Sequence, residues 1–277
     1  MIAASLRSVS RLARSLTAAA VLLGSAAAAG CSTSSDTEAA PISDRVVEVV
    51  EYGEGETTVV FESGFGDDLA PWEKVAGAVA TRARTFAYSR PGYGQSEPSP
   101  EPRDAGQIVE DLRGLLASRG VAPPYVLVGH SFGGAYMELF AKQHPEEVLG
   151  VVLVDPRHRD FTTACEEAGL EGCGIPDSVV ETLPQVEIDE YKAFAHASEE
   201  IHAAGGFGPY PVRVLTATLH GFEPEVEALW ESMHGSLADE AKNGEQKLFV
   251  GAGHYLHLQR ADEVAEVILS LVPPPEG

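Results

Sequence analysis

The 277-residue sequence predicts an α/β fold, with a mostly parallel β-sheet, helices on both of its faces and an inserted helical cap. Between residues 84 and 155, short β-branched runs alternate with segments of helical periodicity, which is typical of parallel strands joined by helices. The alternation stops after residue 155 and resumes near residue 210. We therefore expect a core formed by 44–155 and 210–277, with a cap at 156–209.

Seven elements are predicted in the first part of the core, before the strand that precedes the cap. Runs rich in valine, threonine and aromatic residues predict strands, and apolar residues at helical spacing predict helices. In order, these are strands at 45–53 and 57–64 joined as a hairpin through 54–56, a helix at 70–83, a strand at 84–89, a helix at 104–120, a strand at 125–129 and a helix at 132–144.

The strand that precedes the cap and the elements after it complete the sheet. The same two periodicities predict them. They are a strand at 148–155 before the cap and, after it, a strand at 210–218, a helix at 224–241, a strand at 246–253 and a last helix at 260–272.

The charge balance excludes one class of partner. The chain has 19 lysines and arginines against 42 acids, and its formal net charge is −23. A nucleic-acid surface needs clustered basic residues, so we expect no DNA or RNA binding. An acidic surface also repels anionic lipids and polyanionic substrates.

The N-terminus is typical of an export signal rather than of the fold. Three arginines without an acid precede an alanine-rich apolar run that ends before Cys31. This order predicts a signal peptide at 1–30, and the polar stretch at 31–43 predicts a flexible tether. We expect an exported protein.

Two outcomes of export remain open. The small residues in "AAGC" resemble a bacterial lipobox, in which Cys31 is lipidated and anchors the protein to a membrane, although Ala28 stands where leucine is usual. The alternative is an ordinary signal cleaved near Ala29, which gives a secreted or periplasmic protein.

Export would place the other two cysteines in an oxidising compartment, which changes their expected role. Cys165 and Cys173 lie eight residues apart. In an oxidising compartment such a pair favours a disulfide, and two free thiols are the alternative. No histidine lies between them and no second cysteine pair exists, so a zinc site is not expected.

A serine between glycines stands where the strand at 125–129 becomes a helix. In "GHSFG", a sharp turn at Ser131 would expose the hydroxyl and place helix N-terminal amides beside it. Such a turn brings helix and strand too close for a Cβ at Gly129 or Gly133. The pattern predicts a nucleophile, and a chance match in a loop is the alternative.

With this motif, the sequence resembles the α/β-hydrolase superfamily over about residues 45–272. "VVFESGFGDD" is similar to the superfamily's oxyanion-hole loop, with Ser63 in place of the usual histidine. The resemblance implies that the backbone N–H groups of Phe65 and Phe132 bind the oxyanion. "YSRPGYGQS" is similar to another family loop, with Ser89 in place of aspartate, and we expect it to be a structural turn.

The order of the motifs in the family implies that the base follows the last strand. His254 in "GAGHY" has this position and the expected glycine–histidine spacing. Its neutral imidazole would take the Ser131 proton and later return it to the leaving group. For His130 and His257 we expect packing roles.

A serine and a histidine of this kind need a carboxylate to complete a catalytic triad, and two segments of the sequence could supply it. Many relatives use an aspartate after the strand that follows the cap, but that segment contains only Glu223 and Glu225. Asp155 ends the strand before the cap, and some relatives take their acid from there. We favour Asp155, because it ends a strand at the sheet edge where ligand chemistry gathers.

A serine nucleophile indicates hydrolysis of a small ester, lactone or amide through an acyl-serine intermediate. Epoxide hydrolases and haloalkane dehalogenases of this superfamily need a carboxylate at the nucleophile position, so both are disfavoured. We expect a carboxylesterase-like enzyme, or an aminopeptidase-like one, with no cofactor and no metal. The alternatives are a non-catalytic binding protein on the same scaffold and a cofactor-free perhydrolase or haloperoxidase.

Overall fold

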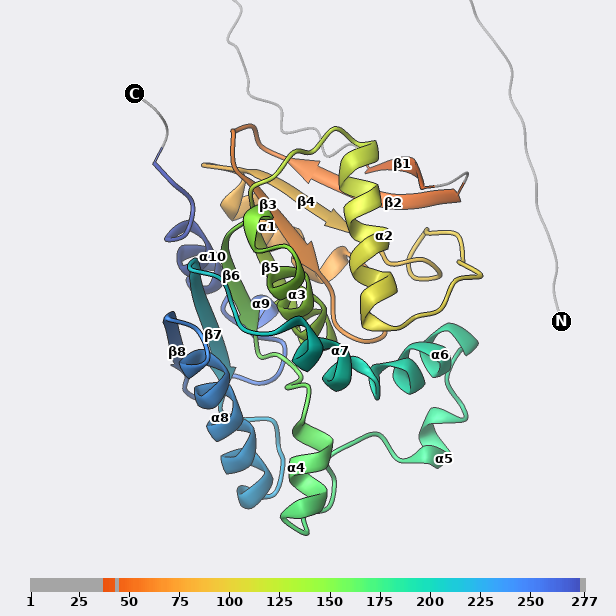
Figure 1. Ribbon diagram of the computed structural model, residues 1–277, viewed down its shortest axis with the longest axis vertical. Coiled ribbons are helices and arrows are strands. Elements are labelled where there is room, and N and C mark those ends of the chain that lie inside the picture. Colours follow the sequence, from red (N-terminus) through yellow and green to blue (C-terminus); the bar gives the residue numbers. More distant parts are fainter. Residues whose placement is uncertain (1–36, 43–44, 275–277) are drawn as a thin grey trace, which may run out of the picture. The chain divides into compact units, whose positions relative to one another are not determined.

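The computed structural model describes residues 37–42 and 45–274, and an eight-stranded sheet forms its centre (Figure 1). The order across the sheet is β1-β2-β4-β3-β5-β6-β7-β8, and every pair from β4 to β8 is parallel. The predicted mostly parallel sheet is therefore confirmed. The strands are β1 (Thr37–Ile42), β2 (Arg45–Tyr52), β3 (Thr58–Glu62), β4 (Arg84–Tyr88), β5 (Tyr125–His130), β6 (Val148–Val154), β7 (Pro211–Ala217) and β8 (Asn243–Phe249).

Helices cover both faces of the sheet, as the alternating sequence pattern predicts. On one face, α2 (Ala105–Ser118), α3 (Phe132–Gln143) and the end of α8 (Pro224–Asp239) pack on the strands. On the other face lie α1 (Glu73–Val79), α9 (Leu256–Gln259) and α10 (Ala261–Leu269). The short 3-10 helices η1 (Ala70–Trp72) and η2 (Pro145–Glu147) precede α1 and β6.

The central strands are apolar on both sides, because both faces of the sheet are covered. In β3, Val60 packs on the α2–α3 side, whereas Val59 and Phe61 pack on the α1–α10 side. Leu127 and Val128 of β5 face opposite sides in the same way. This two-residue period with no polar face is typical of a buried parallel sheet.

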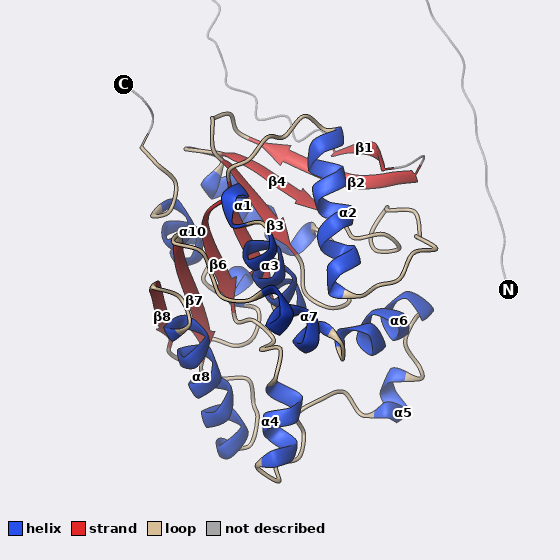
Figure 2. Cartoon of the chain, viewed as in Figure 1, coloured by secondary structure: helices blue, strands red, loops and turns tan. Residues whose placement is uncertain are grey.

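Between β6 and β7 the chain forms four helices and no strand (Figure 2). They are α4 (Phe161–Glu167), α5 (Asp177–Val180), α6 (Gln185–Phe194) and α7 (Ala197–Ala204), and they run along the lower end of the view in Figure 1. Cys165 of α4 forms a disulfide with Cys173, so the predicted pairing is confirmed. Phe161 and Cys165 pack with Val226 and Trp230, which joins α4 to α8.

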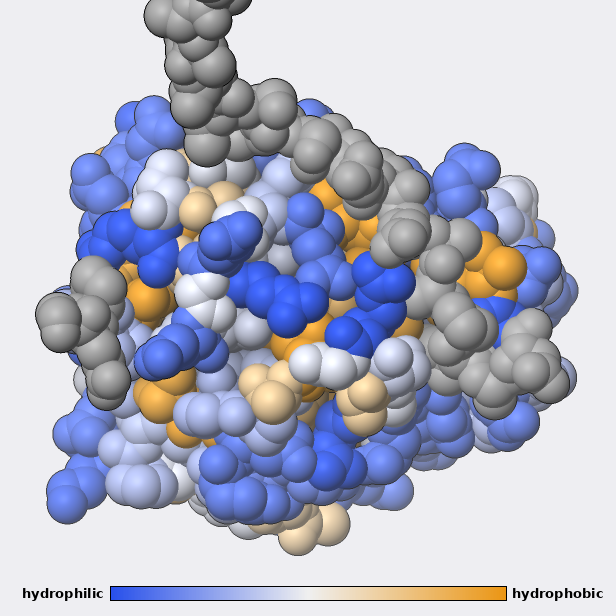
Figure 3. Space-filling view, turned by 90° about the horizontal axis from the view of Figure 1, so that it is seen from above, coloured by the Kyte–Doolittle hydropathy of each residue, from blue (hydrophilic) through white to orange (hydrophobic). Residues whose placement is uncertain are grey.

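Figure 3 shows the end of the molecule opposite α4–α7. Figure 3 looks onto this end from the top of Figure 1 and shows mostly hydrophilic residues, with hydrophobic patches that hydrophilic residues interrupt. A surface of this kind suits a chain in which 22% of the residues are charged.

The predicted hairpin between the first two core strands is wrong. β2 and β3 do not pair, because β4 lies between them, antiparallel to β2 and parallel to β3. All five residues of β3 are buried. A strand buried on both faces is typical of a parallel sheet, and β3 pairs in parallel with β4 and β5. β2 therefore lies nearer the edge of the sheet, where it pairs antiparallel with β4.

The predicted tether at 31–43 also differs from the structure. Its residues 37–42 form β1, which pairs antiparallel with β2. Without β1, the edge of β2 would present unpaired backbone N–H and C=O groups. Another strand can pair with such groups through its backbone, whatever its own side chains are. The predicted signal peptide at 1–30 and the lipidated Cys31 lie outside the described residues. Within the described ranges, no helix has the length and apolar content needed to cross a bilayer.

Candidate active site

Ser131 stands at the sharp turn that the sequence predicts, between the end of β5 and the first residue of α3. Its φ of 53° is in the region that L-residues rarely adopt. Among the described residues, Asp155 at φ 45° is the one other non-glycine residue with positive φ. Backbone strain of this kind gathers at functional sites, and here it marks two residues at the carboxyl edge of the sheet.

The glycines around Ser131 are required by close backbone contacts. A Cβ on Gly129 would lie 2.3 Å from the carbonyl oxygen of Gly133. A Cβ on Gly133 would lie 2.5 Å from the carbonyl oxygen of Ser63. Both distances are below any real Cβ contact, so the steric reason that the sequence suggests for G-x-S-x-G is present in the structure.

The three residues predicted as a triad form one chain of hydrogen bonds. The hydroxyl of Ser131 lies 3.0 Å from Nε2 of His254, and Nδ1 of His254 lies 2.7 Å from Oδ2 of Asp155. Because the Asp155 carboxylate accepts from Nδ1–H, Nε2 is the free acceptor for the serine proton. His254 comes from the loop after β8 and stays partly exposed, whereas Ser131 and Asp155 are buried.

Asp155 receives four hydrogen bonds. Oδ2 accepts from His254 and from Nε2 of His220 at 2.7 Å, and Oδ1 accepts from the Ala217 amide at 2.9 Å and the Trp230 indole at 3.1 Å. Burial by itself raises the pKa of this carboxyl, but the bonds from His220 and His254 outweigh it and hold the pKa well below its usual value. Asp155 is therefore an anion.

His220 lies between two carboxylates, and the sequence analysis did not identify it. Its Nε2 faces Asp155, and its Nδ1 lies 2.6 Å from Oε1 of Glu227. Both ring nitrogens can donate only when the imidazole is protonated. Burial lowers the pKa of His220, but the two carboxylates outweigh this and raise it above its ordinary value. A single histidine after β7 matches no motif in the sequence, so no local pattern predicts its role.

The alternative acids do not approach His254. Glu223 and Glu225 stand at the start of α8, and both are exposed. Among the hydrogen bonds of residues 45–274, neither carboxylate is bonded to a histidine. Glu227, two residues further along α8, reaches the site instead, and it does so through His220.

The predicted oxyanion donors lie beside Ser131 in an aromatic cluster. Within the described part of the chain, the N–H groups of Phe65 and Phe132 have no hydrogen-bond acceptor. The ring of Phe132 stacks on Phe194 at a centroid distance of 3.7 Å, and Phe65 contacts Phe132 at 5.1 Å and Tyr191 at 5.8 Å. Helix α6 therefore packs its aromatic side chains directly on both residues.

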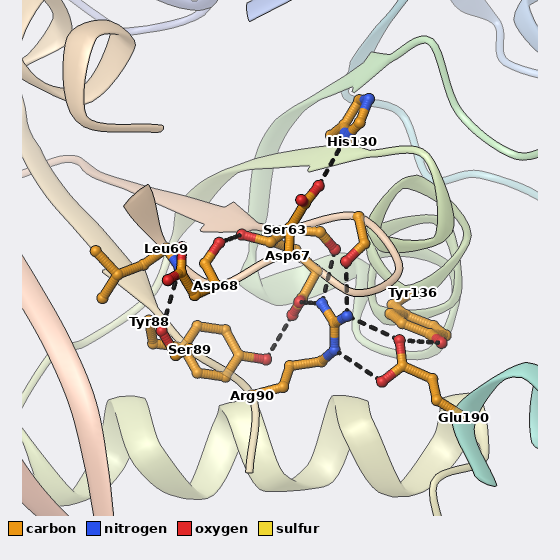
Figure 4. Close-up of polar contacts among 12 residues, drawn as sticks. Ser63, Asp67, Asp68, Leu69, Tyr88, Ser89, Arg90, His130, Tyr136 and Glu190 are labelled. Carbon is orange, nitrogen blue, oxygen red and sulfur yellow. Dashed lines mark hydrogen bonds and ion pairs between the residues drawn. The ribbon is translucent and has the colours of Figure 1, made fainter. Parts of the chain in front are cut away.

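The loop similar to D-R-x-G-x-G-x-S supports the backbone around this site. The hydroxyl of Ser89 accepts from the Leu69 amide at 3.1 Å and donates to Glu48 at 2.7 Å. The hydroxyl of Ser63 donates to the Asp68 carbonyl at 2.7 Å. The contacts of Ser89 with Leu69 and of Ser63 with Asp68 are drawn in Figure 4, together with Arg90, which the sequence analysis did not single out. Ser89 thus fixes the end of the loop at 63–69, as a structural turn would.

His130 and His257 pack under the site. Burial lowers the pKa of His130 well below its ordinary value and lowers that of His257 to about 3, so both are neutral. His257 stacks on Trp72 at 4.5 Å. Nε2–H of His130 donates to the carbonyl of His254 at 3.1 Å, which fixes the backbone of the predicted base.

Two groups in the described ranges could in principle hold a metal. Ligand atoms of Asp155, His220 and His254 all lie within 4.8 Å of one another, but each is already a partner in the hydrogen bonds given above. A metal there would have to replace the protons of both histidines. The second group is His144, Glu146 and Glu147, which lies at the surface around η2.

Comparison with known proteins agrees with the fold. A family described as the alpha/beta hydrolase fold matches residues 57–170. The uncharacterized protein YqjL of Bacillus subtilis (strain 168) is 27% identical over 218 residues, which cover 74% of this chain and 83% of YqjL.

Solved structures give the same result over most of the chain. The epoxide hydrolase CorEH has a TM-score of 0.62 and 17% identity and covers 84% of this chain and 97% of its own. The enol-lactonase from Burkholderia xenovorans LB400 has a TM-score of 0.58 and 18% identity and covers 84% of this chain and 99% of its own. The resemblance to the α/β-hydrolase fold is thereby confirmed.

The position of His220 predicts a dependence of stability on pH. Its pKa is raised on folding, so its contribution to the free energy of unfolding is complete below its unfolded pKa of about 6.5 and is lost as the pH rises through the folded value. Denaturant titrations of the wild type and His220→Gln between about pH 6 and pH 9 should show the difference in unfolding free energy shrinking with rising pH. A difference that is constant or grows with pH would contradict a protonated His220.

Proposed function

We propose that this chain is a serine hydrolase of the α/β-hydrolase superfamily, which cleaves a small ester, lactone or amide through an acyl-serine intermediate. The observation that supports this most directly is the unbroken hydrogen-bond chain from the Ser131 hydroxyl through His254 to Asp155. The strained backbone at its first and last members adds to that support.

The proposed reaction uses each group in turn. Oγ of Ser131 attacks the substrate carbonyl while Nε2 of His254 takes its proton, and Asp155 stabilises the imidazolium that forms. The N–H groups of Phe65 and Phe132 bind the oxyanion of the tetrahedral intermediate. His254 then protonates the leaving group, and a water activated by the same nitrogen hydrolyses the acyl-serine.

The identity of the nucleophile favours acyl transfer over epoxide opening. CorEH is an epoxide hydrolase, but at 17% identity its similarity to this chain concerns the fold alone. The residue at the turn here is Ser131, whereas an epoxide hydrolase of this superfamily needs a carboxylate at that position. The enol-lactonase at 18% identity likewise supports the scaffold, and the lactone remains one of three proposed substrate classes.

In this proposal the helices α4–α7 form a cap over Ser131. Support comes from α6, whose Tyr191 and Phe194 pack on the two residues that supply the oxyanion donors. Such aromatic surroundings favour an acyl or alkyl group and exclude water. The disulfide between Cys165 and Cys173 supports export, with anchoring through a lipidated Cys31 as one proposed outcome and free secretion as the other.

The nucleophile is tested with a fluorophosphonate probe and a panel of p-nitrophenyl esters of rising chain length, beside aminoacyl p-nitroanilides. The wild type should be labelled at Ser131 and should hydrolyse at least one member of the panel. Ser131→Ala should fold, lose labelling and lose several orders of magnitude in kcat. A wild type that folds but is never labelled and never turns over would favour a non-catalytic binding protein.

The acid is tested by comparing carboxyl-to-amide variants. Asp155→Asn should lower the acylation rate by about 10³–10⁴ with little change in KM, because the amide no longer holds the required tautomer of His254. Glu223→Gln and Glu225→Gln are the matched controls and should lose less than about tenfold, since both side chains are exposed. If one glutamine variant were inactive and Asp155→Asn were near wild type, the acid would belong to the later segment.

A further inference from the structure

A buried arginine holds the backbone of the loop that supplies one oxyanion donor. Nη1 of Arg90 donates to the carbonyl of Ser63 at 2.7 Å, and Nη2 donates to the carbonyl of Gly64 at 2.8 Å (Figure 4). The side chain is 1% exposed. Its guanidinium therefore fixes two successive peptide groups immediately before Phe65.

The second of these contacts determines where the Phe65 N–H points. The Gly64 carbonyl and the Phe65 N–H belong to one planar trans peptide, so they point in opposite directions. A peptide whose oxygen is held by Arg90 must direct its N–H away from Arg90. That N–H has no acceptor among the described residues, which suits a donor reserved for a substrate oxyanion.

The arginine is itself held from two sides. Glu62 at the end of β3 accepts from Nη1 at 2.7 Å, and Glu190 of α6 accepts from Nη2 at 2.7 Å and from Nε at 3.3 Å. Both carboxylates are almost fully buried. Burial lowers the pKa of Arg90, but Glu190 and Glu62 outweigh it and keep the arginine charged.

Glu190 is the part of this network that comes from the cap. If α6 moved away, Arg90 would lose the carboxylate that holds two of its nitrogens, and its Nε would be left without an acceptor. The guanidinium would then be held by Glu62 and the two loop carbonyls alone, and a turn that brings Nη2 or Nε to water would release the Gly64 carbonyl. The aromatic contacts of α6 with Phe65 and Phe132 would be lost in the same step.

We infer that Arg90 is a positioning residue for the oxyanion hole, and that Glu190 makes its position depend on the docked cap. The inference rests on the proposed serine hydrolysis. The oxyanion site is complete only while α6 is docked, so the cap regulates the chemical step as well as covering the site.

Three variants separate this role from simple anchoring of the cap. Arg90→Lys keeps the charge but loses the planar fork that reaches two carbonyls at once. Glu190→Gln keeps the shape and removes the charge. Arg103→Met is the matched control, because Arg103 also binds Glu190, at 2.6 Å, but makes no contact with the loop at 63–65.

For each variant, kcat, KM and thermal stability are measured, together with the affinity for an alkyl boronic acid whose serine adduct has an oxyanion. We expect Arg90→Lys to lower kcat by roughly 10²-fold with KM little changed, and to weaken boronate binding by a similar factor. Glu190→Gln should show the same pattern more weakly. Arg103→Met should lower the melting temperature but change kcat by less than about threefold.

Two results would overturn the inference. One is a folded Arg90→Lys with kcat and boronate affinity within about threefold of wild type. The other is Arg103→Met losing kcat in the same proportion as Arg90→Lys, which would reduce the network to an anchor for the cap.

Hydrogen exchange gives a readout that does not need turnover. Amides in the peptide over 62–69 should exchange faster in Arg90→Lys and Glu190→Gln than in Arg103→Met. Equal exchange in the three variants would contradict the positioning role even if the wild type hydrolysed no tested ester. A wild type without turnover, but with the expected exchange pattern, would count against the proposed function and leave the positioning of the loop supported.

Discussion

The burial of the Asp155 carboxylate is the constraint around which the site is arranged. A buried anion is tolerated only when its lone pairs are satisfied, and here the donors come from separate parts of the chain: β7, α8 and the loops after β7 and β8. These segments must therefore meet at one point of the sheet edge. His254 is one of the donors, so the same requirement that compensates the charge also orients the imidazole toward Ser131.

A second buried charge lies on the oxyanion-loop side of Ser131 and has the opposite sign. Arg90 joins β3, the oxyanion loop and α6, as Asp155 joins β7, α8 and the loop of His254. One charge holds the proposed base and the other holds a proposed oxyanion donor, so Ser131 lies between two segments that buried charges fix in place. His220 belongs to the Asp155 network, because it lies between the carboxylates of Asp155 and Glu227. Its positive charge there offsets the repulsion between the two carboxylates.

Local patterns predicted what depends on local geometry. The elbow at Ser131 follows from glycine spacing, the sheet from apolar periodicity, and the Cys165–Cys173 disulfide from proximity in sequence. Long-range pairings had no such pattern: β4 inserts between β2 and β3, and Glu190 meets Arg90 across 100 residues. A polar residue such as His220 is unremarkable in sequence, since its importance comes from two carboxylates that only folding brings to it.

In the proposed mechanism Ser131 forms a covalent acyl intermediate, and trapping this intermediate is the most direct test of that mechanism. The wild type would be mixed with a p-nitrophenyl ester that it hydrolyses, quenched in acid within the first turnover and mapped by peptide mass spectrometry. We expect a mass increase of one acyl group on the peptide that contains Ser131, appearing with the burst of p-nitrophenol. Turnover with the acyl group on another residue, or a burst with an unmodified Ser131, would contradict it.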